Sequence, residues 1–417
     1  MAIQIYSQKS NRWREYYNPL RGLSMPKVVS LLEAGERGQY SDLQWMYYYM
    51  ERSDPMIFAI LQRRRAALLD SDWDVRVPAS VAGNRDRKDP RDGSDSRDSA
   101  AQGMAPDDVL AEEQAACLRE VYDGIENFKD ALGFMFTGFF RGFAHLEKHY
   151  GENGEIQRLE PVEQWFWVRD GMFGEWEYNE NAVSGRRRGV PIERENFVIF
   201  ESVALNRMLA LLYLRRNLSQ KDWDSYLAVY GIPSVFLIGP PNTGEAKEKE
   251  YQAIAEEIIS DGRGYLPNGS DIKYVTGGGN KAPFREHLEY IDRQIAMVGT
   301  GGLLTMLTES GSGTLAGGAH SDTFLQIARG DAVTLSGVLQ REIDLPVLAQ
   351  AFPGRPALAY FEFAPCIPDQ ASRVVQDVAQ LGAAGLAVDP AEVSEKTGYR
   401  VEKAAGAGEE VPAQGVG

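Results

Sequence analysis

Two long segments with helical periodicity, residues 205–230 and 282–308, place the strongest constraint on the fold of this chain. In the second segment, apolar residues recur at alternating intervals of four and three, which gives a narrow seam with a 3.5-residue repeat. Such a seam is suited to packing against another helix. The glycines at 299–302 predict a kink in the second helix. The seam consists of Phe284, Leu288, Ile291, Ile295 and Val298.

The residues between the two helices predict a small α/β unit. Gly231 and Pro233 end the first helix, because glycine favours a helix C-terminus and proline cannot continue a helix. Short apolar runs at 234–238, 264–266 and 271–275 predict strands, and residues 245–260 predict a helix. The expected unit is therefore β-α-β-β.

The residues before position 204 predict a mixed α/β region. Helices are expected at 26–34, from 41 onward, at 55–69, 109–125 and 128–139, and strands at 71–77, 142–150, 159–169 and 176–179. Residues 79–108 interrupt this pattern. Their central part, 84–98, has five basic and five acidic residues and no large apolar residue. Nothing there offsets the entropy of ordering, so the segment is predicted to be a disordered surface insert.

The last part of the chain predicts helices with one strand. Residues 310–321 are rich in glycine and predict a flexible loop, followed by a helix at 321–343 and an apolar strand at 357–363. A helix is expected at 370–382, a weaker one at 390–397, and disorder at 404–417. The fold class is therefore α+β and mainly helical.

Charge and cysteine content restrict the function. The formal net charge of −16 argues against a protein that holds DNA phosphates with its average surface, although local basic patches or DNA that slides past remain compatible. Two cysteines, Cys117 and Cys366, form neither a disulfide framework nor a cysteine zinc site, and fit a reducing cytoplasm. No apolar run approaches the roughly 18 residues of a membrane helix, and no signal peptide is expected.

One short motif raises the possibility of a metal site. In a strand, His145, Glu147 and His149 would share one face. The spacing differs from the His-Glu-x-x-His pattern of zinc proteases, and no third histidine or cysteine lies nearby. An ordinary half-exposed strand is the favoured interpretation, and a metal-dependent hydrolase that uses these three residues is the alternative.

Other motifs give no catalytic chemistry. Residues 311–316 match the loose dinucleotide pattern Gly-x-Gly-x-x-Ala, but a helix precedes them where the pattern needs a strand. We found no set of nucleophile, base and orienting residue, so we expect no cofactor and no enzyme. The basic residues Arg207, Arg215, Arg216 and Lys221, and likewise the run 63–65, are interpreted as solvated faces or intersubunit salt bridges rather than DNA contacts.

Several long motifs resemble Mu-like bacteriophage portal proteins. They are Asn18-Pro-Leu-Arg-Gly-Leu23, the runs 31–38, 43–45, 63–69 and 72–74, Lys221-Asp-Trp-Asp-Ser-Tyr-Leu-Ala-Val-Tyr-Gly-Ile-Pro233, Phe284-Arg-Glu-His-Leu288, and residues 300–320. They follow in the same order over most of residues 18–370. The charged insert and the short carboxy-terminal region depart from the family pattern, and the latter leaves the size of any crown open.

The resemblance implies a portal fold made of an α/β wing, two long stem helices, a small α/β clip and a short helical crown. The implied parts are wing 1–203, stem helix 204–231, clip 232–281, stem helix 282–309, tunnel loop 310–321, wing return 322–369 and crown-like region with tail 370–417. The loop that would line the DNA channel comprises Ser310, Gly311, Ser312, Gly313, Thr314, Leu315, Ala316, Gly317, Gly318, Ala319 and His320.

The resemblance also implies a function and partners. It implies a ring of about twelve copies at one capsid vertex, through which double-stranded DNA is packaged, retained and ejected. Implied partners are the terminase large subunit, which would supply the packaging chemistry, the major capsid and scaffold proteins, and head-completion and tail proteins. The location would be the virion, and the host cytoplasm during assembly. A minor head protein of another kind is a further alternative.

Overall fold

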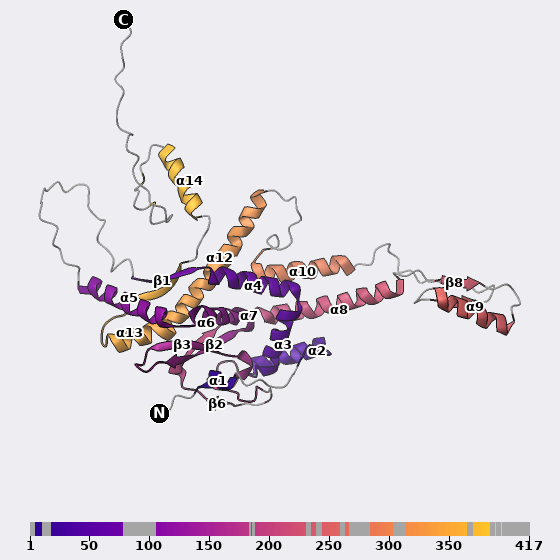
Figure 1. Cartoon of the computed structure of the whole chain (residues 1–417), viewed down its shortest axis with the longest axis horizontal. Coiled ribbons are helices and arrows are strands. Elements are labelled where there is room, and N and C mark those ends of the chain that lie inside the picture. Colours follow the sequence, from indigo (N-terminus) through magenta and orange to yellow (C-terminus); the bar gives the residue numbers. More distant parts are fainter. Residues whose placement is uncertain are drawn as a thin grey trace, which may run out of the picture.

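Helices make up most of the described chain, and four small sheets lie among them (Figure 1). The computed structural model describes residues 5–10, 18–77, 106–182, 185, 188–230, 235–238, 244–258, 263–266, 284–302, 314–364, 370–383, 388 and 393. The predicted disordered segments 84–98 and 404–417, and the predicted strand 271–275, lie outside these residues. Among the described residues, no helix has the length and apolar character needed to cross a membrane.

The amino-terminal helices match the sequence-based expectation. After α1 (Tyr6–Ser10) come α2 (Met25–Glu36), α3 (Ser41–Ser53) and α4 (Pro55–Leu69). The side chain of Asp54 caps α4 by accepting hydrogen bonds from the amides of Met56 (2.9 Å) and Ile57 (3.0 Å). Pro55 suits the first helical position because its fixed φ is already helical.

A three-stranded antiparallel sheet lies at the centre of the larger part of the structure, made of the described residues up to 201 and of residues 324–364, which we call the wing. Helices α5 (Pro106–Gly124), α6 (Phe128–Met135) and α7 (Thr137–Arg141) precede it. Its strand order is β3-β2-β7, with β2 (Phe143–Tyr150) between β3 (Ile156–Val162) and β7 (Phe197–Glu201). Gly142, with a φ of +96°, ends α7 in the left-handed conformation and turns the chain into β2.

The predicted strand 159–169 is wrong as one element. It is divided into the end of β3, the short 3₁₀ helix η1 (Gln164–Phe166) and β4 (Trp167–Val168). Strand β4 pairs with β5 (Glu177–Tyr178), and β5 pairs with β6 (Val190–Pro191). A second 3₁₀ helix, η2 (Arg194–Asn196), leads into β7. The large aromatic residues of these elements form a core cluster of their own, which includes Trp167, Tyr178 and Phe197.

Two long helices extend from the wing towards a small α/β unit (Figure 1). They are α8 (Asn206–Tyr230) and α10 (Phe284–Thr300). The unit at their far end contains β8 (Val235–Ile238), α9 (Glu245–Ile258) and β9 (Arg263–Leu266), and its two strands are parallel. The β-α-β part of the expected unit is therefore present.

The interruption predicted at the glycines 299–302 is present. Helix α10 ends at Thr300, where Gly301 adopts a left-handed φ of +67° and its amide bonds to the carbonyl of Met297. The predicted continuation at 303–308 lies outside the described residues.

The return segment begins with a helix that starts within the predicted loop. Helix α12 (Thr314–Leu339) includes Thr314–Ser321 of the segment predicted to be a flexible loop. Leu315, Ala316 and Ala319 are helix-compatible, and a packed helix can extend over one or two turns of such sequence. A π-helical turn, η3 (Gln340–Asp344), leads into α13 (Leu345–Ala351).

The last elements close the wing. Strand β10 (Tyr360–Ala364) returns beside β1 (Asp72–Arg76) in antiparallel register, so residues far apart in the chain share one sheet. Helix α14 (Gln370–Ala383) follows. It agrees with the helix predicted at 370–382, while most of the predicted helix 390–397 lies outside the described residues.

Candidate functional site

Helices α8 and α10 pack side by side and form a two-helix stem, as the apolar seam predicted (Figure 1). Ile291 and Ile295 at the centre of the seam are 1% and 0% exposed, and Phe284, Leu288 and Val298 are half-buried. Near the far end, the ring of Phe284 stacks on Trp223 at 6.5 Å and contacts Tyr226 at 5.7 Å. Phe284 therefore joins the far ends of the two helices, and the seam is buried in the core around Ile291 and Ile295.

Arg216 joins the stem to the wing. Its Nη1 lies 2.8 Å from Oδ2 of Asp54, the residue that caps α4, and its Nε lies 2.8 Å from Oδ1 of Asp292 on α10. One guanidinium thus links α8, α4 and α10. Burial raises the pKa of the Asp292 carboxyl, and the positive charge of Arg216 opposes that rise.

Arg64 makes a second, more deeply buried junction. Its Nη2 donates to both carboxylate oxygens of Asp331 on α12 at 2.8 Å, and its Nη1 donates to the carbonyl of Gly299 on α10 at 3.2 Å. Burial raises the pKa of Asp331, and the Arg64 charge opposes this. The prediction of a solvated face is wrong for Arg64, which is 6% exposed, because α10 and α12 both cover α4 at this point.

The amino-terminal end of α8 has its own buried anchor. Asn206 donates from Nδ2 to Oε1 of Glu51 at 2.7 Å, and Arg141 donates from Nη2 to Oε2 of Glu51 at 2.6 Å. Gln164 completes the network by accepting from Nη1 of Arg141 at 2.9 Å. Sequence analysis missed these residues because they come from α3, α7, η1 and α8, which are far apart in the chain.

The predicted channel segment lies between two firmly packed helix ends. Thr300, the last residue of α10, is buried, and its hydroxyl lies within hydrogen-bonding distance of the carbonyls of Ala296 and Gly302. On the other side, α12 joins the core at Phe324, and the guanidinium of Arg63 lies 4.6 Å from the Phe324 ring centroid. Of the predicted loop residues, Ser310–Gly313 lie outside the described residues and Thr314–His320 belong to α12.

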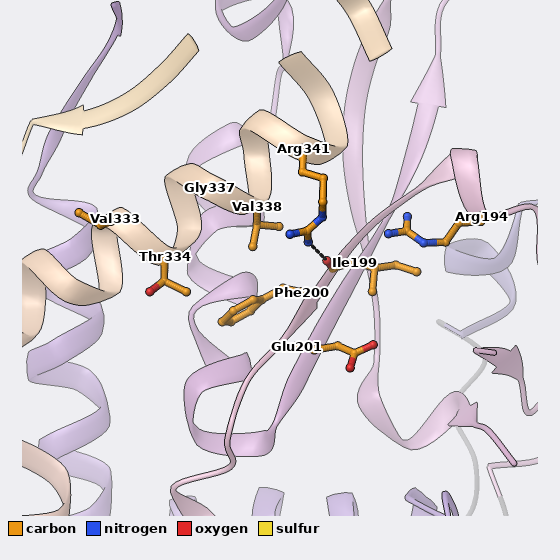
Figure 2. A pocket seen from close by; sticks show the side chains of 9 residues that line it. All are labelled: Arg194, Ile199, Phe200, Glu201, Val333, Thr334, Gly337, Val338 and Arg341. Carbon is orange, nitrogen blue, oxygen red and sulfur yellow. Dashed lines mark hydrogen bonds between the residues drawn. The ribbon is translucent and has the colours of Figure 1, made fainter. Parts of the chain in front are cut away.

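A cavity of about 500 Å³ lies between β7 and the end of α12 (Figure 2). Arg341 bridges it by donating from Nη2 to the carbonyl of Ile199 at 3.2 Å. Arg194 binds both carboxylate oxygens of Glu342 at 2.7 Å, which keeps the pKa of Glu342 below its usual value despite burial. The charged residues that line this cavity are therefore paired with groups outside it: Arg194 and Arg341 with Glu342, and Glu201 with Arg169.

The proposed metal motif has a different role in the structure. Strand β2 is the central strand, and it is buried from Phe143 to Lys148, so the prediction of a half-exposed strand is wrong. His145 lies among the rings of Phe143, Trp167 and Trp176, and burial lowers its pKa to about 3. Within the described ranges, no three His, Cys, Asp or Glu side chains are grouped so that they could hold a metal ion.

Glu147 uses its carboxylate to bind the amino-terminal segment. It accepts hydrogen bonds from the backbone amides of Tyr6 (2.7 Å) and Ser7 (2.6 Å). His149 lies beside it, with Nε2 at 3.3 Å from the Glu147 carboxylate. The three residues of the motif are thus engaged in packing and hydrogen bonding, and nothing in their arrangement supports the hydrolase alternative.

Comparison with solved structures identifies the fold. A chain in the neck of an empty gene transfer agent (GTA) particle, computed with C6 symmetry, superposes with a TM-score of 0.50 at 14% identity, over 89% of this chain and 93% of that chain. A chain in the virion of the native GTA particle gives a TM-score of 0.50 at 14% identity, over 94% and 97%. Because the likeness extends over most of both chains, it shows a shared fold.

Sequence comparison identifies relatives of the chain and its family. The Mu-like prophage FluMu protein gp29 of Haemophilus influenzae is 23% identical over 366 residues, which cover 83% of this chain and 65% of that protein. The portal protein of Escherichia phage Mu is 21% identical over 357 residues, covering 81% and 62%. This chain thus spans less than two thirds of the length of either relative. The family described as portal protein of Mu bacteriophage matches residues 44–399, and the chain belongs to this family.

Proposed function

We propose that this chain is a portal subunit, which assembles into a closed ring and forms the channel for double-stranded DNA at one capsid vertex. The observation that carries the proposal is the stem. Two long helices project from the wing, are fixed to it by Arg216, and hold a small α/β unit at their far end. A projecting helix pair of this kind can line a channel only when several copies stand side by side around an axis.

The stem has an exposed stripe suited to such a neighbour. On α10, a second 3.5-residue repeat runs along the exposed side, formed by Glu286, Tyr290, Arg293 and Met297. Tyr290 is 59% exposed and Met297 is 47% exposed. Large apolar side chains at heptad spacing are typical of a helix that packs against another helix.

The partner of this stripe is α8 of a second copy. The exposed side of α8 carries Met208, Arg215 and Leu218 at intervals of seven and three residues, which matches the repeat of the α10 stripe. Arg215 gives this side of α8 a positive charge, while the α10 stripe contains the exposed Glu286. Two different faces in contact give a head-to-tail interface, and repetition of that interface around an axis closes a ring.

The charge of the chain fits passage of DNA without tight binding. The net charge of −16 has the same sign as the phosphates. The segment Ser310–His320, between α10 and the packed part of α12, contains no Lys, Arg, Asp or Glu. We propose that it faces the channel and contacts DNA without reading sequence.

The oligomeric state of the purified chain tests the proposal. We expect native mass spectrometry and negative-stain images to give a ring of about twelve copies.

Arg215→Glu should reduce the ring population, and Arg215→Glu with Glu286→Arg should restore it, because the second change returns opposite charges to the interface. Phe173→Ser, at a residue that is 94% exposed on the wing, is the matched control and should leave rings intact. A wild-type chain that stays monomeric or dimeric at high concentration contradicts the proposed function, whereas rings unaffected by Arg215→Glu contradict only the assigned interface.

A portal ring of this kind would bind several partner proteins. The ring would dock a terminase large subunit during packaging, contact major capsid and scaffold proteins while the head assembles in the host cytoplasm, and later bind head-completion and tail proteins in the virion. Residues 232–281 are proposed as the clip and residues 370–417 as a short crown-like region. Co-purification of the ring with each candidate partner, compared with a clip deletion variant, tests these contacts one by one.

A further inference from the structure

The amino-terminal segment Tyr6–Ser10 packs against strands β2 and β3 of the wing sheet. Two consecutive backbone amides, those of Tyr6 and Ser7, donate to the two separate oxygens of Glu147 at 2.7 and 2.6 Å. Glu147 is 0% exposed and stands on the central strand β2, about in the middle of the sheet. The segment therefore covers a carboxylate that the sheet alone would leave open at its surface.

Side-chain contacts add specificity for the segment. The hydroxyl of Ser7 lies 2.7 Å from Nε2 of His149. The ring of Tyr6 lies 4.8 Å from that of Tyr178 and 5.8 Å from that of Phe197, and its hydroxyl donates to the carbonyl of Pro191 at 3.3 Å. Tyr6 and Ser7 are almost completely buried in this position.

The surface that contacts the segment is built by residues that do not belong to the segment. Tyr178 and Phe197 belong to an aromatic cluster that also contains Trp167 and Trp176, so they remain packed if Tyr6 leaves. Among the described residues, the hydrogen-bond partners of the Glu147 carboxylate are the two amides of the segment and the His149 ring. A buried carboxylate needs such donors, because removal of its partners leaves an uncompensated charge away from water.

We propose that Glu147, His149, Tyr178, Phe197 and Pro191 form a peptide-binding site, which binds the Tyr6–Ser10 segment even when the segment is supplied as a separate peptide. The chemistry defines the ligand: an aromatic residue with a phenolic hydroxyl, followed by a serine, with free amides on both residues. Proline at either position is excluded because it lacks the N–H that Glu147 binds.

Binding of a separate peptide tests the proposal. The chain without residues 1–10 is titrated into a fluorescent peptide that spans residues 3–12, and anisotropy is measured. We expect saturable binding with one peptide per chain. Glu147→Gln should weaken it by about tenfold or more, because the glutamine side chain offers one acceptor oxygen where the two amides use two. A peptide with Tyr6→Ala should bind weakly as well.

A neighbouring glutamate provides the matched control. Glu152 is exposed in the turn between β2 and β3, away from the segment, so Glu152→Gln should leave peptide affinity unchanged. Absence of saturable binding to a folded truncated chain, or equal binding by the Glu147→Gln chain, overturns the proposal.

The full-length chain gives a second measurement if the truncated chain does not fold. Cleavage by trypsin after Lys9 requires release of the segment from the site. Glu147→Gln should accelerate this cleavage by about tenfold relative to wild type. Cleavage at other positions, and cleavage after Lys9 in the Glu152→Gln control, should stay unchanged. An unchanged rate after Lys9 in the Glu147→Gln chain also overturns the proposal.

Discussion

The guanidinium of Arg64 holds both carboxylate oxygens of Asp331 at 2.8 Å, although 267 positions separate the two residues in the sequence. The same guanidinium donates to the carbonyl of Gly299. The pair therefore fixes the end of α10 against the part of α12 that follows the proposed channel segment.

Removal of one partner of this pair should destabilise the chain strongly. Asp331→Ala leaves a buried arginine without its counter-charge, and we expect the free energy of unfolding to fall by about 3–5 kcal/mol. Replacement of both partners, Arg64→Leu with Asp331→Leu, should recover a large part of the loss, since no charge then remains buried. Urea denaturation measures both changes. The exposed pair Arg285–Glu289 is the control, and Glu289→Ala should cost less than about 0.5 kcal/mol. Equal losses in Asp331→Ala and Glu289→Ala would contradict the prediction.

Asp344 should make stability depend on pH. Burial raises its pKa from 3.8 to about 6, while hydrogen bonds from the Phe361 amide and the Tyr122 hydroxyl limit the rise. Because the folded pKa is above the unfolded one, the folded state holds the proton more tightly. The resulting stabilisation is complete below pH 3.8 and is lost as pH rises through about 6.

This pH dependence is tested by measuring the free energy of unfolding of the wild type and of Asp344→Asn at several pH values. Between about pH 4.5 and pH 7, the free energy of unfolding of the wild type should fall relative to that of the variant by about 2 kcal/mol. The asparagine side chain of the variant cannot titrate, so this difference isolates the single carboxyl group. Parallel pH profiles for the two chains would show that the Asp344 pKa is the same in the folded and unfolded states.

Replacement of either of two glycines in long helices by alanine should change the free energy of unfolding, with opposite signs at the two positions. A Cβ at Gly299 would meet the side chain of Ile60, where α10 packs against α4, whereas nothing lies within 4 Å of a Cβ at Gly330 in α12. Gly299→Ala should therefore lower the free energy of unfolding by about 1–3 kcal/mol. Gly330→Ala should raise it by about 0.5–1 kcal/mol, since alanine is the better helix former. Thermal unfolding of the two variants checks the opposite signs.

Elements with a local signal were predicted well from the sequence. The 3.5-residue seam of α10 and the Pro55–Leu69 helix depend on residues a few positions apart, and both are present in the structure. The buried role of Arg64 was missed because its partner lies on α12, and no local pattern indicates that pairing. The role of Glu147 was missed for the same reason: its ligands are backbone amides 140 and 141 positions away, and amides leave no mark in a sequence.

Helix α12 begins at Thr314, several residues before it enters the core at Phe324. Deletion of Thr314–Gly318 removes residues from the start of α12 but leaves Phe324, where the helix enters the core, and the Arg64–Asp331 pair in place. We therefore expect a folded chain that assembles as the wild type does. The deletion shortens the proposed channel segment by more than one helical turn, since a turn takes about 3.6 residues, so the segment should no longer reach the DNA.

In a phage that carries this deletion, heads should form at normal numbers but retain less DNA, measured as nuclease-resistant DNA per head. Arg285→Ala, an exposed change at the far end of the stem, serves as the control. Normal DNA retention by the deletion phage would place the segment away from the channel, even if rings and heads form.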